Sequence, residues 1–211
     1  MNSVLRRVMP PKFLYFDMGN VLLSFSHEQA AAQIAAVAGI SYERAWQIVF
    51  DEGLQEQYER GTINWGQFYH LFCLAADCSP DPALLDDAAS AIFKESPGIV
   101  SLLMKLRTGG QRMGVLSNTS PSHWRHVTKQ FPFLTELLCE YALSYELGAM
   151  KPDEAVYAAA EELAGVSGPE IFFTDDRAEN VAAAQSRGWD AVLFASPLKL
   201  QADLAARGFC I

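Results

Sequence analysis

"FLYFDMGN", residues 13–20, joins a short apolar run to an acidic residue, with a glycine close behind it. Four consecutive apolar and aromatic residues, 13–16, are typical of a buried strand. Asp17 follows directly, and Gly19 and Asn20 come next. Because ligands of open α/β sheets bind beyond the carboxyl ends of the strands, this pattern indicates a strand whose tip presents a carboxylate at a binding edge.

The rest of the chain alternates similar apolar runs with helical patterns. Further strands are expected at 113–117, 171–174 and 191–194, with a weaker one at 141–145. Helices are expected at 99–110, 153–165 and 177–188, and another should begin with Ser120 as N-cap and Pro121 at its first position. This alternation predicts an α/β fold in which helices cover both faces of a parallel sheet.

A segment of helical character interrupts the alternation between about residues 24 and 97. Ser26, Ser41 and Asn64 are suitable N-caps there, and Gln67 completes a capping box with Asn64. The stripe formed by Trp65, Phe68, Leu71, Phe72 and Ala75 is expected to face a core. No strand is expected in this segment, so we predict a helical insertion, 24–97, within a core made of 1–23 and 98–211.

Composition narrows the classes of partner. The 211 residues are 50% hydrophobic and 19% charged, with a formal charge of −9, which disfavours nucleic acid and anionic membranes. The four cysteines, at positions 73, 78, 139 and 210, match no zinc or disulfide pattern. The N-terminal residues 1–12 do not resemble a signal peptide, and no apolar run is long enough to span a bilayer. A cytoplasmic protein is therefore expected.

Polar residues follow several of the expected strands. In chain order they are Asp17, then Ser117 and Asn118, then the Lys151–Pro152 pair before a helix, then Asp175 and Asp176. Each is more often a turn or cap residue when it occurs alone. Their joint order at the carboxyl ends of the strands points to one shared site.

These motifs resemble those of the haloacid dehalogenase superfamily over nearly the whole chain. "FDMGNVL" (16–22) is similar to the nucleophile motif, "VLSNT" (115–119) to the phosphate-holding motif, "MKPDEAVY" (150–157) to the lysine motif and "FFTDDRAENV" (172–181) to the acidic metal motif. Together with "YERGTINWGQF" (58–68), they look most like bacterial phosphatases of the α-D-glucose-1-phosphatase type. The resemblance implies a Rossmann-like, three-layer core and a small helical cap of the C1 type.

The resemblance also implies an activity and a set of roles. It implies a phosphatase for small phosphorylated metabolites, sugar 1-phosphates above all, that forms an aspartyl-phosphate on Asp17. Mg²⁺ would be held by Asp17, Asp176 and the Gly19 carbonyl, and Asp175 would assist by orienting a metal-bound water or Lys151. Lys151 would add positive charge, and Ser117 and Asn118 would bind the phosphate. Nothing in the sequence separates a monomer from a homodimer.

One position departs from the family pattern. Most phosphatases of the superfamily carry a second aspartate as general acid two residues after the nucleophile, where Gly19 stands here. Loss of a general acid typically lowers the rate by roughly 10²–10⁴. His27 or Glu28 could replace it, the leaving group could need little protonation, or the protein could be a poor catalyst. We favour the second reading, because the similar sugar-1-phosphate phosphatases share this glycine.

Other functions use the same residues differently. A 2-haloacid dehalogenase would not need the acidic pair at 175–176, and a phosphomutase would depend on the missing acid. A binding or regulatory protein would not need the intact set of Asp17, Ser117, Lys151 and Asp176. In the insertion, Trp46, Tyr58, Arg60, Trp65 and His70 could line a substrate site, although core packing is the simpler role for most of them.

Overall fold

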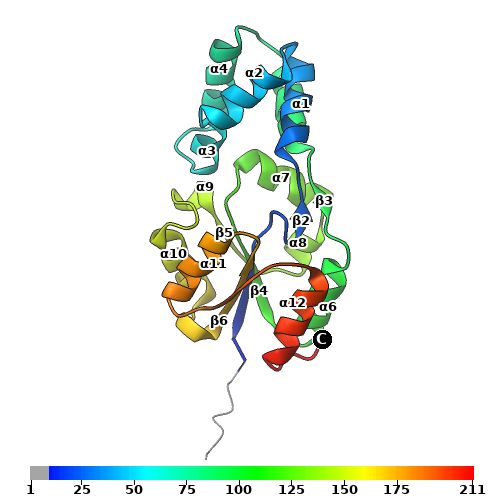
Figure 1. Ribbon diagram of the computed structural model, residues 1–211, viewed down its shortest axis with the longest axis vertical. Helices are drawn as coiled ribbons and strands as arrows, with labels where there is room; N and C mark the ends of the chain where they lie inside the picture. Colours follow the sequence, from blue (N-terminus) through cyan, green and yellow to red (C-terminus); the bar gives the residue numbers. More distant parts are fainter. Residues whose placement is uncertain (1–9) are drawn as a thin grey trace, which may run out of the picture.

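The computed structural model describes residues 10–211. The prediction that residues 1–12 are not a signal peptide lies almost entirely outside this range. A five-stranded sheet forms the centre of the larger part of the molecule (Figure 1). Its strands are β1 (Phe13–Phe16), β4 (Arg112–Ser117), β5 (Glu140–Leu143), β6 (Ile171–Asp175) and β7 (Asp190–Leu193). They run parallel in the order β5-β4-β1-β6-β7, so the strand that ends at Asp17 lies in the middle.

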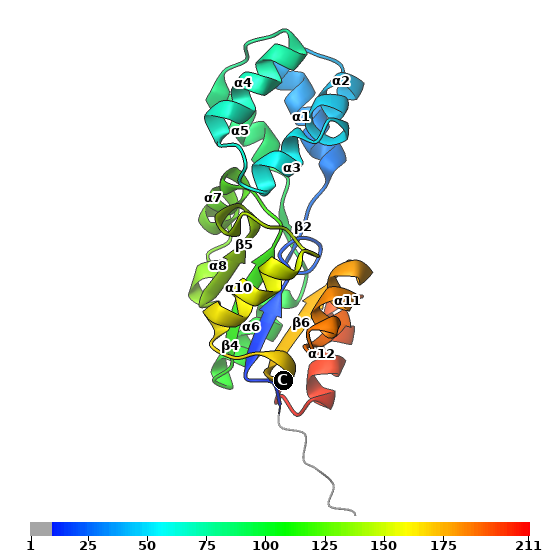
Figure 2. The same cartoon turned by 90° about the vertical axis from the view of Figure 1, so that its left-hand side faces the viewer.

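The sheet is covered on both faces by helices (Figures 1 and 2). Leu14 and Phe16 pack with α6 (Ile99–Thr108), α7 (Pro121–Gln130), α8 (Phe133–Glu136) and α12 (Pro197–Ala206). Phe13 and Tyr15 pack with α10 (Glu154–Ala164) and α11 (Ala178–Ser186). Successive side chains of a strand point to opposite faces, so burial of all four residues of β1 requires two covered faces. The expected three-layer α/β fold is confirmed.

Two strand predictions are wrong in detail. The weaker run expected to continue to residue 145 ends as a strand at Leu143, and Ser144 begins the short helix α9 (Ser144–Leu147). The last strand is displaced by one residue and spans Asp190–Leu193. A short helix with 3₁₀ geometry, Gly168–Glu170, precedes β6. Strand ends depend on pairing with neighbours, which a single-sequence pattern does not reveal.

The segment after β1 is a helical bundle with its own core (Figure 2). Its helices are α1 (His27–Ala38), α2 (Tyr42–Trp46) with a π-helical continuation (Gln47–Asp51), α3 (Leu54–Glu59), α4 (Trp65–Ala76) and α5 (Pro82–Ser90). Ser26, Ser41 and Asn64 cap α1, α2 and α4 as predicted, and Asn64 forms the capping box with Gln67.

Two features of this segment differ from the sequence prediction. Short strands lie at its ends, where β2 (Leu23–Ser24) pairs with β3 (Lys94–Glu95) and joins the outgoing and returning chains. Two-residue strands are too short to show an alternating pattern. On α4, Phe68 is buried, but Leu71 is 39% exposed, so the apolar stripe is not entirely core. Among the described helices, none has both the length and the hydrophobicity needed to cross a bilayer.

Candidate active site

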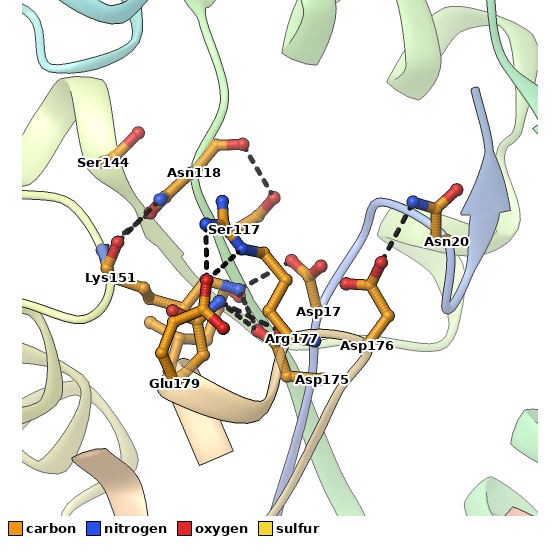
Figure 3. Close-up of polar contacts among 12 residues, drawn as sticks. Asp17, Asn20, Ser117, Asn118, Ser144, Lys151, Asp175, Asp176, Arg177 and Glu179 are labelled. Carbon is orange, nitrogen blue, oxygen red and sulfur yellow. Dashed lines mark hydrogen bonds and ion pairs between the residues drawn. The ribbon is translucent and has the colours of Figure 1, made fainter. Parts of the chain in front are cut away.

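Lys151 is the centre of the site at the carboxyl edge of the sheet (Figure 3). Its ammonium Nζ donates to Asp17 Oδ1 at 2.7 Å, to Asp175 Oδ2 at 2.6 Å and to the Leu116 carbonyl at 2.8 Å. These acceptors come from the adjacent strands β1, β6 and β4, or from the residue that follows a strand, so the sheet itself aligns them. All three ammonium protons therefore have acceptors, as a buried ammonium requires.

Asp175 is the most deeply placed carboxylate, with no exposed surface. Besides Lys151, its oxygens accept from the Asn180 amide, at 3.0 Å to each oxygen, and Oδ1 accepts from the Arg177 backbone N–H at 2.8 Å. Both oxygens are thus engaged by protein donors. The side chain is suited to hold Lys151 in position, since a further direct partner would have to displace one of these bonds.

Asn118 connects the end of β4 to the loop that carries Lys151. Its amide donates to the Lys151 carbonyl at 3.0 Å, and its side-chain oxygen accepts from the Lys151 N–H at 2.7 Å. Ser117 is buried, and its hydroxyl donates to the Asn118 carbonyl at 3.3 Å. The residues that line the adjacent cavity include Asn118 and Thr119, whereas Ser117 lies behind them.

A cavity of about 170 Å³ opens above these residues. Asp17, Asp176 and Lys151 contribute to its polar side, and Phe25 and Phe93 line its apolar side. Typical pockets for drug-sized ligands measure roughly 300–1,000 Å³. The cavity is therefore of a size for a small polar group next to a short organic portion.

Gly19 lies at the edge of this cavity, in contact with Phe25. A Cβ built on Gly19 would stand 2.7 Å from Cε1 of Phe25, much closer than two carbon atoms normally approach. The left-handed backbone in this turn is adopted by Asn20, with φ 56°, and the Asn20 amide donates to Asp176 at 3.0 Å. A side chain on residue 19 would therefore require the Phe25 ring to shift.

Charge in the site is unbalanced toward the negative. One oxygen from each of Asp17, Asp175 and Asp176 lies within 4.8 Å of the other two. The Lys151 ammonium is bonded to Asp17 and Asp175, but not to Asp176. Burial raises the pKa of Asp17 to about 6, against the opposing effect of Lys151. Burial lowers the pKa of Lys151, but the carboxylates of Asp17 and Asp175 outweigh it and raise the pKa above its ordinary value. The oxygen donors and the excess negative charge fit a hard divalent cation.

Of the residues of the insertion that were predicted as candidate acids or substrate contacts, only some lie at the cavity. His27 lines the cavity, and burial lowers its pKa. Glu28 is exposed and accepts a hydrogen bond from Ser26 at 2.7 Å, away from the cavity. Tyr58 pairs with the Ser122 hydroxyl, and the other four candidates, Trp46, Arg60, Trp65 and His70, also lie outside the cavity lining.

Two titratable residues of the cavity wall were not anticipated. Glu59, the last residue of α3, lines the cavity, and burial raises its pKa to about 7. His123, in the first turn of α7, also lines it, and burial lowers its pKa to about 4. Glu59 lies within "YERG", a stretch otherwise typical of an exposed helix end, so only its place in the resembling cap motif could have drawn attention to it.

Comparisons with known proteins agree with the fold and with a hydrolase activity. The chain is 28% identical over 190 residues to a phosphatase of Mycobacterium tuberculosis, covering 84% of each chain. It is 26% identical over 185 residues to a sesquiterpene phosphatase of Aspergillus oryzae, covering 84% of this chain and 86% of that one. A HAD family enzyme from Bacteroides thetaiotaomicron, solved in complex with magnesium and inorganic phosphate, superposes with a TM-score of 0.80 at 25% identity, over 89% of this chain and 96% of that one. The family model for haloacid dehalogenase-like hydrolases matches residues 12–188, and the chain belongs to this family.

Proposed function

We propose that this hydrolase is a Mg²⁺-dependent phosphatase that cleaves small phosphate monoesters through an aspartyl-phosphate on Asp17. The observation that carries the proposal is the Lys151 ammonium bonded to Asp17 and Asp175 at the floor of a cavity that Asp176 also lines. The relatives named as phosphatases and the magnesium and phosphate complex of a similar enzyme support it.

In this proposal Asp17 attacks phosphorus. Its position at the end of the central strand keeps the carboxylate fixed while one side remains open to the cavity. Lys151 lowers the repulsion between the carboxylate and the phosphoryl oxygens, since its ammonium is already held against Asp17. The aspartyl-phosphate is then hydrolysed by water, which frees Asp17 for another turnover.

Asp17, Asp176 and the Gly19 carbonyl are the proposed ligands of Mg²⁺. When bound, Mg²⁺ would offset the charge of the carboxylates and of the phosphoryl group. We assign Asp175 to the support of Lys151, because its oxygens already accept hydrogen bonds from Lys151, Asn180 and the Arg177 N–H. Of the two roles predicted for Asp175, orienting a metal-bound water or orienting Lys151, we propose the second.

The phosphate is expected to sit against the turn after β4. Asn118 is fixed through its side chain to the Lys151 backbone, so its main chain has a defined position at the cavity. Ser117 would join the phosphate-binding set by turning its hydroxyl from the Asn118 carbonyl toward the ligand. Both roles remain predictions of the motif resemblance.

Sugar phosphates are the proposed substrate class, with sugar 1-phosphates favoured, as in the α-D-glucose-1-phosphatase type. An anomeric leaving group needs less protonation than an ordinary alkoxide, so it depends least on whichever group replaces the acid that is missing at residue 19. The expected location is the cytoplasm and the expected state is a monomer or homodimer. Equal turnover of glucose 1-phosphate and glucose 6-phosphate would contradict the substrate preference.

Cleavage of p-nitrophenyl phosphate with and without Mg²⁺ tests the activity. We expect Mg²⁺-dependent turnover by the wild type, none by Asp17→Asn, and unchanged turnover by Asp87→Asn, which alters an exposed aspartate of α5. Cleavage that survives Asp17→Asn would reject the proposed nucleophile. Absence of cleavage in the wild type would favour a binding protein, and release of chloride from 2-chloropropionate would favour a dehalogenase.

A further inference from the structure

The leaving group needs a proton that residue 19 cannot supply. Phe25 occupies the space that a side chain on Gly19 would need, so the usual position of the acid is filled by an aromatic ring. The titratable side chains that line the cavity from the insertion and from α7 are His27, Glu59 and His123. Any replacement acid supplied by the protein must come from such a group, because it must reach the bound ester.

Glu59 is attached to the core next to the proposed phosphate site. Its carbonyl accepts a hydrogen bond from the Ser144 hydroxyl at 2.6 Å. The same hydroxyl accepts from the Thr119 N–H at 2.9 Å and lies 3.0 Å from the Thr119 carbonyl. Thr119 belongs to the turn after β4 and lines the cavity. One buried hydroxyl therefore ties the end of α3 to the turn expected to hold the phosphate.

Neighbouring residues hold the end of α3 in the same place. The Tyr58 hydroxyl lies 2.7 Å from the Ser122 hydroxyl in α7. Arg60 donates to Asp153 at 2.8 Å, immediately before α10. With contacts on both sides of Glu59, its side chain is directed into the cavity by fixed backbone and not by a mobile loop, which proton transfer to a bound ester requires.

The surroundings of Glu59 favour a carboxyl group that keeps its proton near neutral pH. The Gln55 amide donates to Oε1 at 2.9 Å, which leaves Oε2 for the cavity. Burial is the main effect that raises the pKa, to about 7, and the charges of Glu56 on α3 and Asp17 on the core add to it. Lys151, also at the cavity, is bonded to Asp17 and Asp175.

The two histidines are less suited to give up a proton. Burial lowers the pKa of both, so both are neutral near pH 7. His123 has Nε2 at 3.2 Å from the Ala89 carbonyl, which engages its N–H away from the ester. The ring of His27 lies between those of Phe25 and Phe50, at centroid distances of 5.0 Å and 4.6 Å.

We propose that Glu59 is the general acid and base of this phosphatase. The helical insertion supplies it in place of the aspartate that most phosphatases of the family carry where Gly19 stands here. The inference rests on the proposed function. In the first step Asp17 forms a bond to phosphorus, the bond from phosphorus to the ester oxygen breaks, and Glu59 gives its proton to that oxygen. In the second step water bonds to phosphorus, Glu59 takes the water's proton, and the bond from Asp17 to phosphorus breaks to release phosphate.

Leaving-group dependence provides the test. p-Nitrophenyl phosphate and phenyl phosphate are similar in size, but the nitrophenolate leaves without a proton and the phenolate benefits from one. In Glu59→Gln, which keeps the side-chain shape and an acceptor for Gln55, we expect the first turnover of p-nitrophenyl phosphate to stay within about threefold of wild type. The rate of the first turnover of phenyl phosphate should fall by at least about tenfold, because loss of a general acid typically lowers the rate by roughly 10²–10⁴.

A matched variant and the wild type complete the design. Glu43→Gln makes the same substitution at an exposed position of α2 in the insertion and should leave both first turnovers unchanged. In the wild type, the rate with phenyl phosphate, but not with p-nitrophenyl phosphate, should fall above pH about 7. The inference would be overturned if Glu59→Gln lowered the first-turnover rates with both substrates equally or lowered neither. Identical pH profiles of the wild type with the two substrates would also overturn it. Cleavage that survives Asp17→Asn would instead reject the proposed function.

Discussion

Adding one methyl group at residue 19 should destabilise the protein through Phe25. The Cβ of Gly19→Ala would stand 2.7 Å from Cε1 and 3.3 Å from Cδ1 of the Phe25 ring. The centroid of the ring lies 5.0 Å from that of His27 and 5.8 Å from that of Phe93, so a shift of the ring would disturb both aromatic contacts. Overpacking of this kind typically costs about 1–3 kcal/mol. We therefore expect the free energy of unfolding to fall by about 1–3 kcal/mol.

A double-mutant cycle in urea, with metal-free protein at pH 7, isolates the contact. Phe25→Ala removes the obstructing ring, so Gly19→Ala should cost at least about 1 kcal/mol less in that background than in the wild type. Gly66→Ala is the control, because Gly66 lies exposed within α4, where alanine is favoured over glycine by up to about 1 kcal/mol.

Additive effects of the two substitutions would refute this reasoning. They would mean that the ring moves away without loss, and that Phe25 does not keep an acidic side chain out of this position. A stable Gly19→Asp variant with enhanced turnover of phenyl phosphate would also refute the reasoning, because it would show that residue 19 can accommodate an acidic side chain.

Three further predictions concern the charges and hydrogen bonds of the site. A carboxyl group whose pKa is raised on folding, from 4.5 to about 7 for Glu59, destabilises the native state as pH rises through that interval. Between pH 4.5 and 8, the free energy of unfolding of Glu59→Gln should therefore rise by roughly 3 kcal/mol relative to that of wild type, as measured by urea titration of metal-free protein. Ser144→Ala should cost about 1–3 kcal/mol in the same assay, since it leaves the Thr119 N–H without its acceptor. Asp175→Asn should lower the free energy of unfolding by roughly 3–5 kcal/mol, because it breaks a buried ion pair. Asp176→Asn should change it by less than about 0.5 kcal/mol and should instead raise the Mg²⁺ concentration needed for half-maximal activity. Similar stability losses for both variants would contradict the assigned roles.

Local sequence patterns predicted much of the fold because its elements have local causes. The four-residue strand that ends at Asp17 is buried on both faces, so its hydrophobicity is continuous and easy to recognise. Helix starts at Ser26, Asn64 and Ser120 were predictable because each cap is satisfied within three residues. The two-residue strands β2 and β3 were not predicted, because their pairing joins residues about 70 positions apart and leaves no local pattern.

The site was only partly accessible from sequence for a similar reason. Asp17 and Asp175 could be brought together by a rule about strand ends, and Lys151 could be added from the resembling motif; the structure does join all three. Glu59 could not be found in this way, because its raised pKa arises from burial, and burial where the insertion meets the core leaves no periodic signal in the sequence. The obstruction at Gly19 depends on a side chain six residues away whose direction is set by tertiary packing.

The site as proposed divides the chemistry between two parts of the chain. The core supplies the nucleophile and the compensating charge, through Asp17 and Lys151, and both are fixed by the sheet. The insertion supplies the proton through Glu59, which is fixed to the core through the Ser144 hydroxyl. Substitutions that shift α3 should therefore alter the response to leaving-group basicity before they alter attack on phosphorus. A family that keeps its core and varies its insertion can in this way change substrate choice and proton delivery together, without disturbing the carboxylate that forms the phosphoenzyme.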